Sequence, residues 1–220
     1  MRSVIIVAGG RGERMGSDIP KQFLIVDDKP ILMHTITKFY KYDAEMEIVV
    51  VLPKTQQEYW QQLCHDYAFY IPHIIADGGE QRFHSVRNGL QKISPSSTLI
   101  GVHDGVRPYV SLATITLCYD TAAKKGTAIP VIDIVETIRH IDINDNDNIK
   151  SHTVPRHEYK LVQTPQVFQS SIIRQAYQQD YSPAFTDDAS VVEALGTTSI
   201  TLVCGNQENI KITTPSDLRN

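Results

Sequence analysis

The sequence has few cysteines and no long apolar run among its 220 residues. Cys64, Cys118 and Cys204 lie far apart and are odd in number, and no CxxC pair or Cys/His cluster indicates a zinc site. The apolar run Val4–Ala8 is too short for a signal peptide, and no stretch approaches the about 20 apolar residues of a membrane span. We therefore expect a cytoplasmic protein with reduced thiols and no membrane partner.

A surplus of positive charge is also lacking. The chain has 21 Lys and Arg against 25 Asp and Glu, which gives a formal net charge of -4. A general nucleic-acid binder normally carries a basic excess, so we expect no nucleic-acid partner. An anionic small substrate stays open, because the local placement of cations matters more than their total. The length suits a full core, and no linker or repeat divides the chain, so we expect one domain over residues 1–220.

Standard nucleotide-binding motifs are absent, although a glycine-rich loop follows the first apolar run. In VAGGRGERMGSDIPKQF (7–23), Met15 stands where G-x-G-x-x-G needs its third glycine, and no Gly-Lys-Ser/Thr closes a P-loop. Glycines let a backbone approach an anion closely, while Arg and Lys add charged donors. The loop therefore predicts a phosphate site, and a tight turn with two solvated cations is the alternative. The candidate residues are Gly9, Gly10, Gly12, Arg14 and Lys21.

Short apolar runs alternate with amphipathic segments along most of the chain. This alternation predicts an α/β fold, with a mostly parallel twisted sheet and helices on both faces. Pro30 suits the first helical position of one helix, and Thr55-x-x-Glu58 reads as a capping box at the start of the next. The expected strands are 4–8, 48–52, 74–76, 99–103 and 128–132, and the expected helices are 31–42, 55–67 and 81–93. Ligands of such sheets bind at the carboxyl ends of the strands.

The segment VETIRHIDINDNDNIKSHTV (135–154) breaks this rhythm. Alternating residues flank a cluster of turn formers, Asn144–Asn148, which predicts a long β-hairpin. The flanks are too polar to be buried on both faces. We therefore expect a protruding β-arm at about residues 135–156, of the kind that embraces a second subunit.

The segment VHDGVRP (102–108) places Asp104 at a strand end, close to the glycine-rich loop. A carboxylate at that point predicts a Mg²⁺ ligand, since magnesium commonly takes one or two carboxylates plus substrate phosphates. A turn-capping aspartate is the alternative. We expect His103 to be packed or hydrogen-bonded, because no second histidine lies at ligand spacing.

Three hydroxyl-rich segments complete the candidate motifs. They are QTPQ (163–166), FTDDAS (185–190) and NIKITTP (209–215). Each alone is typical of a turn or a helix cap, and Asp187 with Asp188 reads as an N-terminal capping pair. The G-x-S-x-G motif is missing, which argues against a serine hydrolase of that kind.

Taken together and in this order, the motifs resemble the 2-C-methyl-D-erythritol 4-phosphate cytidylyltransferase family of the non-mevalonate isoprenoid pathway. The resemblance runs from Val4 to Leu218 through AGGRGERM, PKQF, DGGEQRFHSV, HDGVRP, TPQ, TDDAS and NIKIT. It implies a Rossmann-like nucleotidyltransferase fold and a homodimer that exchanges its β-arms. It also implies that the phosphate of methylerythritol phosphate attacks the α-phosphorus of CTP, releasing pyrophosphate.

The resemblance implies a role for each matching position. Arg14 and Lys21 would be catalytic, neutralising charge at the α-phosphorus, and Asp104 would hold Mg²⁺ beside the nucleotide. The cytidine pocket would comprise Ala8, Gly9, Gly79, Glu80, Ser85 and Gly105. The residues facing methylerythritol phosphate would be Arg107, Thr164, Thr186 and Lys211, together with Thr137 and Arg156 from the arm of the other subunit.

Two other functions compete with this interpretation. A ribitol-5-phosphate cytidylyltransferase would share the opening loop and NIKITTP, but it would resemble this chain less at GGEQRFHSV and FTDDAS. A nucleotide sensor without chemistry would be expected to lack a phosphate-facing cation or the metal carboxylate. This chain retains all of them, including Arg14, Lys21, Asp104, Arg156 and Lys211.

Overall fold

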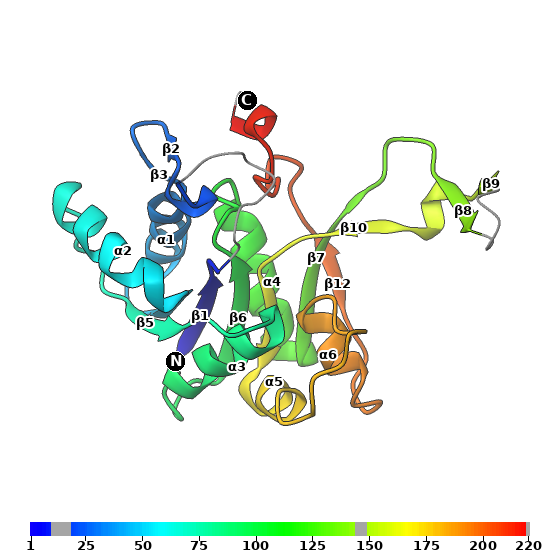
Figure 1. Ribbon diagram of the computed structural model, residues 1–220. Coiled ribbons are helices and arrows are strands. Elements are labelled where there is room, and N and C mark those ends of the chain that lie inside the picture. The colour runs from blue at the N-terminus through cyan, green and yellow to red at the C-terminus, as the bar shows by residue number, and fades with distance from the viewer. Residues whose placement is uncertain (10–18, 144–148, 219–220) are drawn as a thin grey trace.

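The computed structural model describes residues 1–9, 19–143 and 149–218, and its centre is a mixed, mostly parallel β-sheet (Figure 1). The strand order is β10-β7-β11-β6-β1-β4-β5, and β12 also pairs with β7. Six of these strands are β1 (Arg2–Val7), β4 (Glu47–Leu52), β5 (Ile74–Asp77), β6 (Leu99–Asp104), β7 (Thr127–Asp133) and β12 (Leu202–Cys204). The expected fold class is confirmed, and the expected strands are present with ends shifted by at most two residues.

Two antiparallel strands were not expected from the sequence. Strand β11 (Gln166–Gln169) lies between β6 and β7 and runs antiparallel to both, while β10 (Lys160–Val162) pairs antiparallel with β7. The start of β11 falls in the QTPQ segment, which alone is typical of a turn. Val167 and Phe168 are fully buried, so burial in the sheet overrides the local turn signal.

Helices cover both faces of the sheet, as the alternation predicted. Alternate residues of β1 point to opposite faces of the sheet. Val4 and Ile6 pack in the hydrophobic cluster with α1, α2 and α4, whereas Ile5 packs in the cluster with α3, α5 and α6. Strands buried on both faces therefore read as continuous apolar runs. The helices are α1 (Ile31–Tyr42), α2 (Lys54–Asp66), α3 (Arg82–Lys92), α4 (Leu112–Lys125), α5 (Ser170–Ala176) and α6 (Asp188–Glu193).

The helix starts correct two details of the sequence interpretation. Pro30 and Pro53 stand at the N-cap positions of α1 and α2, and neither helix has a side-chain cap. The expected capping box at Thr55 is therefore wrong, because α2 has already begun at Lys54 and Thr55 lies inside it. At α6 the capping prediction holds for Asp187, whose side chain accepts from the Ser190 N–H in a reciprocal capping box.

The remaining elements are short. Strands β2 (Ile25–Val26) and β3 (Lys29–Pro30) form a small ribbon, and the 3₁₀ helices are η2 (Lys21–Phe23), η3 (Arg156–Glu158) and η4 (Pro215–Leu218). All three cysteines are free thiols, as expected. Within the ranges that the structure covers, no helix is both long and apolar enough to cross a membrane.

The predicted β-hairpin is present and projects from the sheet (Figure 1). Strands β8 (Arg139–Ile143) and β9 (Ile149–Thr153) pair antiparallel as a separate two-stranded sheet. The expected tip, Asn144–Asn148, lies outside the described residues. The hairpin is thus a distinct extension, and an exchange of arms between subunits stays a prediction.

Candidate active site

A cavity of about 210 Å³ lies at the carboxyl ends of β1, β5 and β6. These strands bring together segments that are distant in sequence. Residues of η2 and Lys211 from the C-terminal segment also line the cavity. The predicted site residues that line this cavity are Ala8, Gly9, Lys21, Gly79, Glu80, Ser85, Asp104 and Lys211. Gly10, Gly12 and Arg14 lie outside the described residues. The predicted edge of the sheet thus gathers most of the described candidates in one place.

A larger and more open hollow of about 700 Å³ lies elsewhere, next to the first residue of β6. Among the described residues, its one charged lining residue is Arg174, which donates to the carbonyls of Leu90, Ile93 and Ser94. That guanidinium is therefore occupied in holding the end of α3. The smaller cavity is the candidate active site, because several charged groups converge there.

Asp104 is the centre of the charge arrangement in the small cavity. Its Oδ2 accepts from Arg107 Nε at 3.1 Å and lies 3.2 Å from Lys211 Nζ, while Oδ1 lies 3.9 Å from Arg82 Nε. Burial by itself would raise the pKa of Asp104, but the three cations together hold it well below the usual range. The carboxylate is therefore ionised at neutral pH, in a setting that attracts further negative charge.

A buried hydrogen-bond chain fixes the position of Asp104. His103 Nε2 lies 3.1 Å from the Arg107 carbonyl, which can only accept, so Nε2 carries the proton. The Thr164 hydroxyl then donates to His103 Nδ1 at 2.9 Å and accepts from the Asp104 N–H at 3.1 Å. Burial lowers the pKa of His103 to about 4, which keeps the ring neutral. The expectation that His103 is packed and hydrogen-bonded is confirmed.

Arg82 is a site residue that the sequence interpretation left out of the site. It lines the cavity and makes a bidentate ion pair with Asp188, at 2.8 and 2.7 Å. Asp188 is fully buried and also accepts from the Tyr177 hydroxyl at 2.6 Å. Its expected capping role is therefore wrong, because its carboxylate is committed to Arg82. Burial would lower the pKa of Arg82, but Asp188 raises it above its usual value.

The turn between β5 and α3 forms another wall of the cavity. The Gly79 N–H donates to Ser85 Oγ at 2.9 Å, which closes the turn onto the first helical residues. A Cβ at Gly79 would lie 2.4 Å from the Cβ of His84, so only glycine fits there. Gln81, the N-cap of α3, makes no side-chain cap. The N-terminus of α3 therefore borders the cavity with backbone donors suited to an anion.

The remaining predicted residues lie beside the cavity or away from it. Gly105 follows Asp104, and a Cβ there would meet the Ala8 Cβ at 2.9 Å. Arg107 and Thr164 hydrogen-bond to Asp104 but do not line the cavity, and Thr186 is exposed before α6. Thr137 and Arg156 are exposed near the base of the arm and do not line the cavity of their own chain; Arg156 donates to the Val135 carbonyl. Their contact with a substrate stays a prediction.

Comparison with known proteins identifies the family. The sequence profile of the IspD family, 2-C-methyl-D-erythritol 4-phosphate cytidylyltransferase, matches residues 2–220. The chain belongs to this family. It is 57% identical over 218 residues to the Bacteroides thetaiotaomicron protein of that name, covering 99% of this chain and 96% of the relative. The Phocaeicola vulgatus protein of the same name is 59% identical, with the same coverage.

Solved structures agree with this family membership. The Francisella tularensis 2-C-methyl-D-erythritol 4-phosphate cytidylyltransferase has a TM-score of 0.79 and 30% identity, covering 99% of this chain and 96% of that one. The 4-diphosphocytidyl-2C-methyl-D-erythritol synthase of Anaerococcus prevotii has a TM-score of 0.81 and 26% identity, covering 99% and 94%. The resemblance inferred from the IspD motifs is confirmed.

Proposed function

We propose that this IspD-family protein transfers CMP from CTP to 2-C-methyl-D-erythritol 4-phosphate. A phosphate oxygen of the acceptor attacks the α-phosphorus, the bond to the β-phosphate oxygen breaks, and pyrophosphate leaves. The products are 4-diphosphocytidyl-2-C-methyl-D-erythritol and pyrophosphate. The observation that carries the proposal is the convergence of Lys21, Arg82 and Lys211 on the cavity that holds Asp104.

This reaction asks the protein mainly for positioning and charge stabilisation, because no covalent enzyme intermediate is required. Lys21 and Lys211 offer compact ammonium charges, and Arg82 offers a guanidinium whose orientation Asp188 fixes. Preorganised cations of this kind stabilise charge that develops in a transition state. We propose Lys21 as a catalytic residue, and Arg14 as a second one from the same loop.

We propose Mg²⁺ as the cofactor, with Asp104 as its protein ligand. The donor set fits, because magnesium sites in phosphoryl-transfer enzymes commonly combine one or two carboxylates with substrate phosphates. A bound Mg²⁺ supplies charge neutralisation across the phosphates. Arg82, Arg107 and Lys211 oppose a divalent cation at Asp104 alone. We therefore expect Asp104 to hold the ion only together with the triphosphate.

The turn between β5 and α3 is proposed to receive the cytidine. Gly79, Glu80 and Ser85 line the cavity, as do Ala8 and Gly9. A wall of backbone carbonyls and amides can pair with the edge of a base, and an acceptor placed for the N4 amino group would favour cytosine over uracil. The hydrogen bond from the Gly79 N–H to Ser85 Oγ ties this wall to the start of α3.

We propose a homodimer in which each arm reaches the acceptor site of the other subunit. Large apolar side chains are exposed along the arm and its base, which is typical of a surface that a partner covers. They are Val135, Ile141, Tyr159, Leu161 and Val162. Thr137 and Arg156 would then supply contacts that the cavity lacks within one chain. The free thiols suit the reducing cytoplasm, where we place the protein.

The test measures pyrophosphate release from CTP and Mg²⁺, with methylerythritol phosphate and ribitol 5-phosphate as parallel acceptors. Fast release with methylerythritol phosphate alone is expected, because the Arg82–Asp188 pair joins the two motifs that distinguish the families. Release with ribitol 5-phosphate alone would overturn the acceptor assignment. CTP binding without turnover of either acceptor would overturn the proposed reaction.

A further inference from the structure

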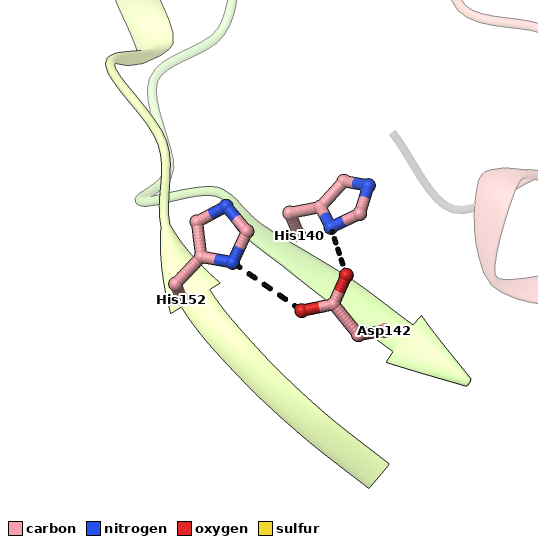
Figure 2. A group of neighbouring side chains, drawn as sticks. All are labelled: His140, Asp142 and His152. Carbon is pink, nitrogen blue, oxygen red and sulfur yellow. Dashed lines mark ion pairs between the residues drawn. The ribbon is translucent and has the colours of Figure 1, made fainter. Parts of the chain in front are cut away.

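The arm carries a group of side chains that the proposed reaction does not use. His140 on β8 and His152 on β9 are directly opposite each other in the register of the hairpin, and their ring centroids lie 5.1 Å apart. Asp142 follows His140 by two residues, so it lies on the same face of the hairpin. Figure 2 shows the three side chains converging, with both imidazoles directed at the carboxylate.

Two short contacts link these groups. His140 Nδ1 lies 3.2 Å from Asp142 Oδ1, and His152 Nδ1 lies 3.6 Å from Asp142 Oδ2. One ligand atom from each residue lies within 4.8 Å of the others, and all three side chains are exposed. Exposed side chains can turn by the small amount that ligation at about 2 Å requires. The backbone of the hairpin therefore already presents the donors that a metal ion would need.

We propose that His140, Asp142 and His152 form a binding site for a divalent transition-metal ion of the zinc class on the β-arm. The ligands would be one nitrogen from each imidazole and one carboxylate oxygen, with water completing the coordination. Three protein ligands and an open position make a chemically complete zinc site. Imidazole favours zinc and its neighbours over magnesium, so this site differs from the one proposed at Asp104.

Neighbouring charges limit the affinity of this site for a divalent metal ion. Lys150 is the register partner of Asp142 and lies on the same face, so its ammonium opposes a divalent ion. Arg139 lies on the other face, where it donates to Ser151 and Thr153. Within the described parts of the chain, the site thus has Lys150 as an adjacent cation and no carboxylate besides Asp142 within the cluster. We expect moderate affinity that depends on both histidines.

A metal ion at this position would join the two strands of the arm. An isolated two-stranded hairpin is marginally stable in water, and β8 and β9 form a separate sheet in the described chain. An ion that binds only the paired form stabilises that pairing by mass action. Metal binding would therefore hold His140 and His152 in register and make the arm more rigid.

The experiment is a calorimetric titration of the 220-residue protein with Zn²⁺ in excess Mg²⁺, repeated with Co²⁺ to record its ligand-field absorption. We expect one ion per chain and a cobalt spectrum that shows nitrogen ligation. His140→Ala and His152→Ala should each lower the affinity at least about tenfold. His65→Ala is the matched control: His65 lies 3.4 Å from Asp66 but belongs to no such cluster in the ranges that the structure describes, so its removal should leave binding unchanged.

Hydrogen exchange provides an independent readout on the backbone. Zn²⁺ should slow amide exchange in β8 and β9 of the unaltered protein, and it should have no such effect in His152→Ala. The proposal is overturned if no ion binds, or if the arm substitutions leave the affinity within the range of the His65→Ala control. Slower exchange in β8 and β9 that persists in His152→Ala would overturn it as well.

Discussion

The cavity at the sheet edge and the β-arm are built in opposite ways. Asp104 is 8% exposed and is held by groups from separate segments of the chain, including Arg107, Thr164 and Lys211. In the arm, β8 pairs only with β9 in the described chain, and Arg156 at its base is exposed. Packing therefore positions the groups of the cavity before a substrate arrives. Arg156 lies in η3 and donates to the Val135 carbonyl at the base of the arm, so in the proposed dimer it would reach a substrate bound to the partner subunit.

This difference predicts that substitutions in the two regions affect different properties of the protein. Substitutions that unbalance buried charges near the cavity should alter both stability and chemistry. Substitutions in the arm should spare the fold and remove only a function that needs the second subunit.

Arg156→Ala should abolish use of the acceptor while leaving the fold and CTP binding intact, because the residue is exposed and lies away from the cavity of its own chain. Product formation, CTP affinity and circular dichroism measure the three properties. Mixing this variant with Lys21→Ala should restore activity, since heterodimers with exchanged arms regain one intact site. No recovery after verified subunit exchange would contradict the exchanged arm.

Arg82→Ala should destabilise the protein by about 3–5 kcal/mol, because it leaves the fully buried Asp188 without its guanidinium partner. Urea unfolding monitored by tryptophan fluorescence measures the loss. The matched variant combines Arg82→Ala with Asp188→Ala and should recover part of this stability, since no unpaired charge stays buried. Equal losses in the single and double variants would show that the ion pair is not the cause.

Lys21→Ala should lower kcat by about 10²-fold or more, as for the loss of a charged donor to the transition state. Steady-state pyrophosphate release measures this change, and thermal unfolding checks that the fold persists. Lys54→Ala is a suitable control, because Lys54 is an exposed lysine that pairs with Asp77 outside the cavity. A near-normal rate for Lys21→Ala would remove Lys21 from the chemistry.

The smallest effect concerns His73, a histidine outside both regions. Its Nδ1 donates to the Ile71 carbonyl at 2.8 Å and its Nε2 accepts from Trp60 at 3.0 Å, and burial lowers its pKa. As the pH falls below about 6.5, His73 therefore takes up a proton in the unfolded chain before it does so in the folded chain. The free energy of unfolding decreases over that range. The slope from this group is at most about 1.4 kcal/mol per pH unit. The free energy of unfolding of His73→Gln, measured between about pH 7 and pH 5, should therefore change less with pH than that of the unaltered protein.

Much of the sheet was predictable from the sequence because buried parallel strands read as apolar runs. The strands from β1 to β7 in the main sheet, and the edge at which Asp104 and the glycine-rich loop meet, follow from that pattern. Strand β11 was missed, because its short segment carries turn residues and is made a strand by burial against β6 and β7. Local propensity is a weak guide where tertiary contacts decide.

The site shows the same division. The residue chemistry of the motifs indicates Lys21 and Asp104, and the family resemblance implies Lys211; all three line the cavity. Arg82 was left out of the site because its role depends on Asp188, a residue far away along the chain. The two histidines of the arm were likewise not recognised as a group, because only the register of the hairpin places them together.

The sequence by itself determined the α/β fold, the family and the chemical types present at the sheet edge, because hydrophobic period and motif spacing are local properties. Tertiary structure decided which of those groups face one another. It paired Arg82 with Asp188, surrounded Asp104 with three cations and set His140 against His152. These pairings depend on long-range packing and strand register, which the order of residues along the chain does not reveal.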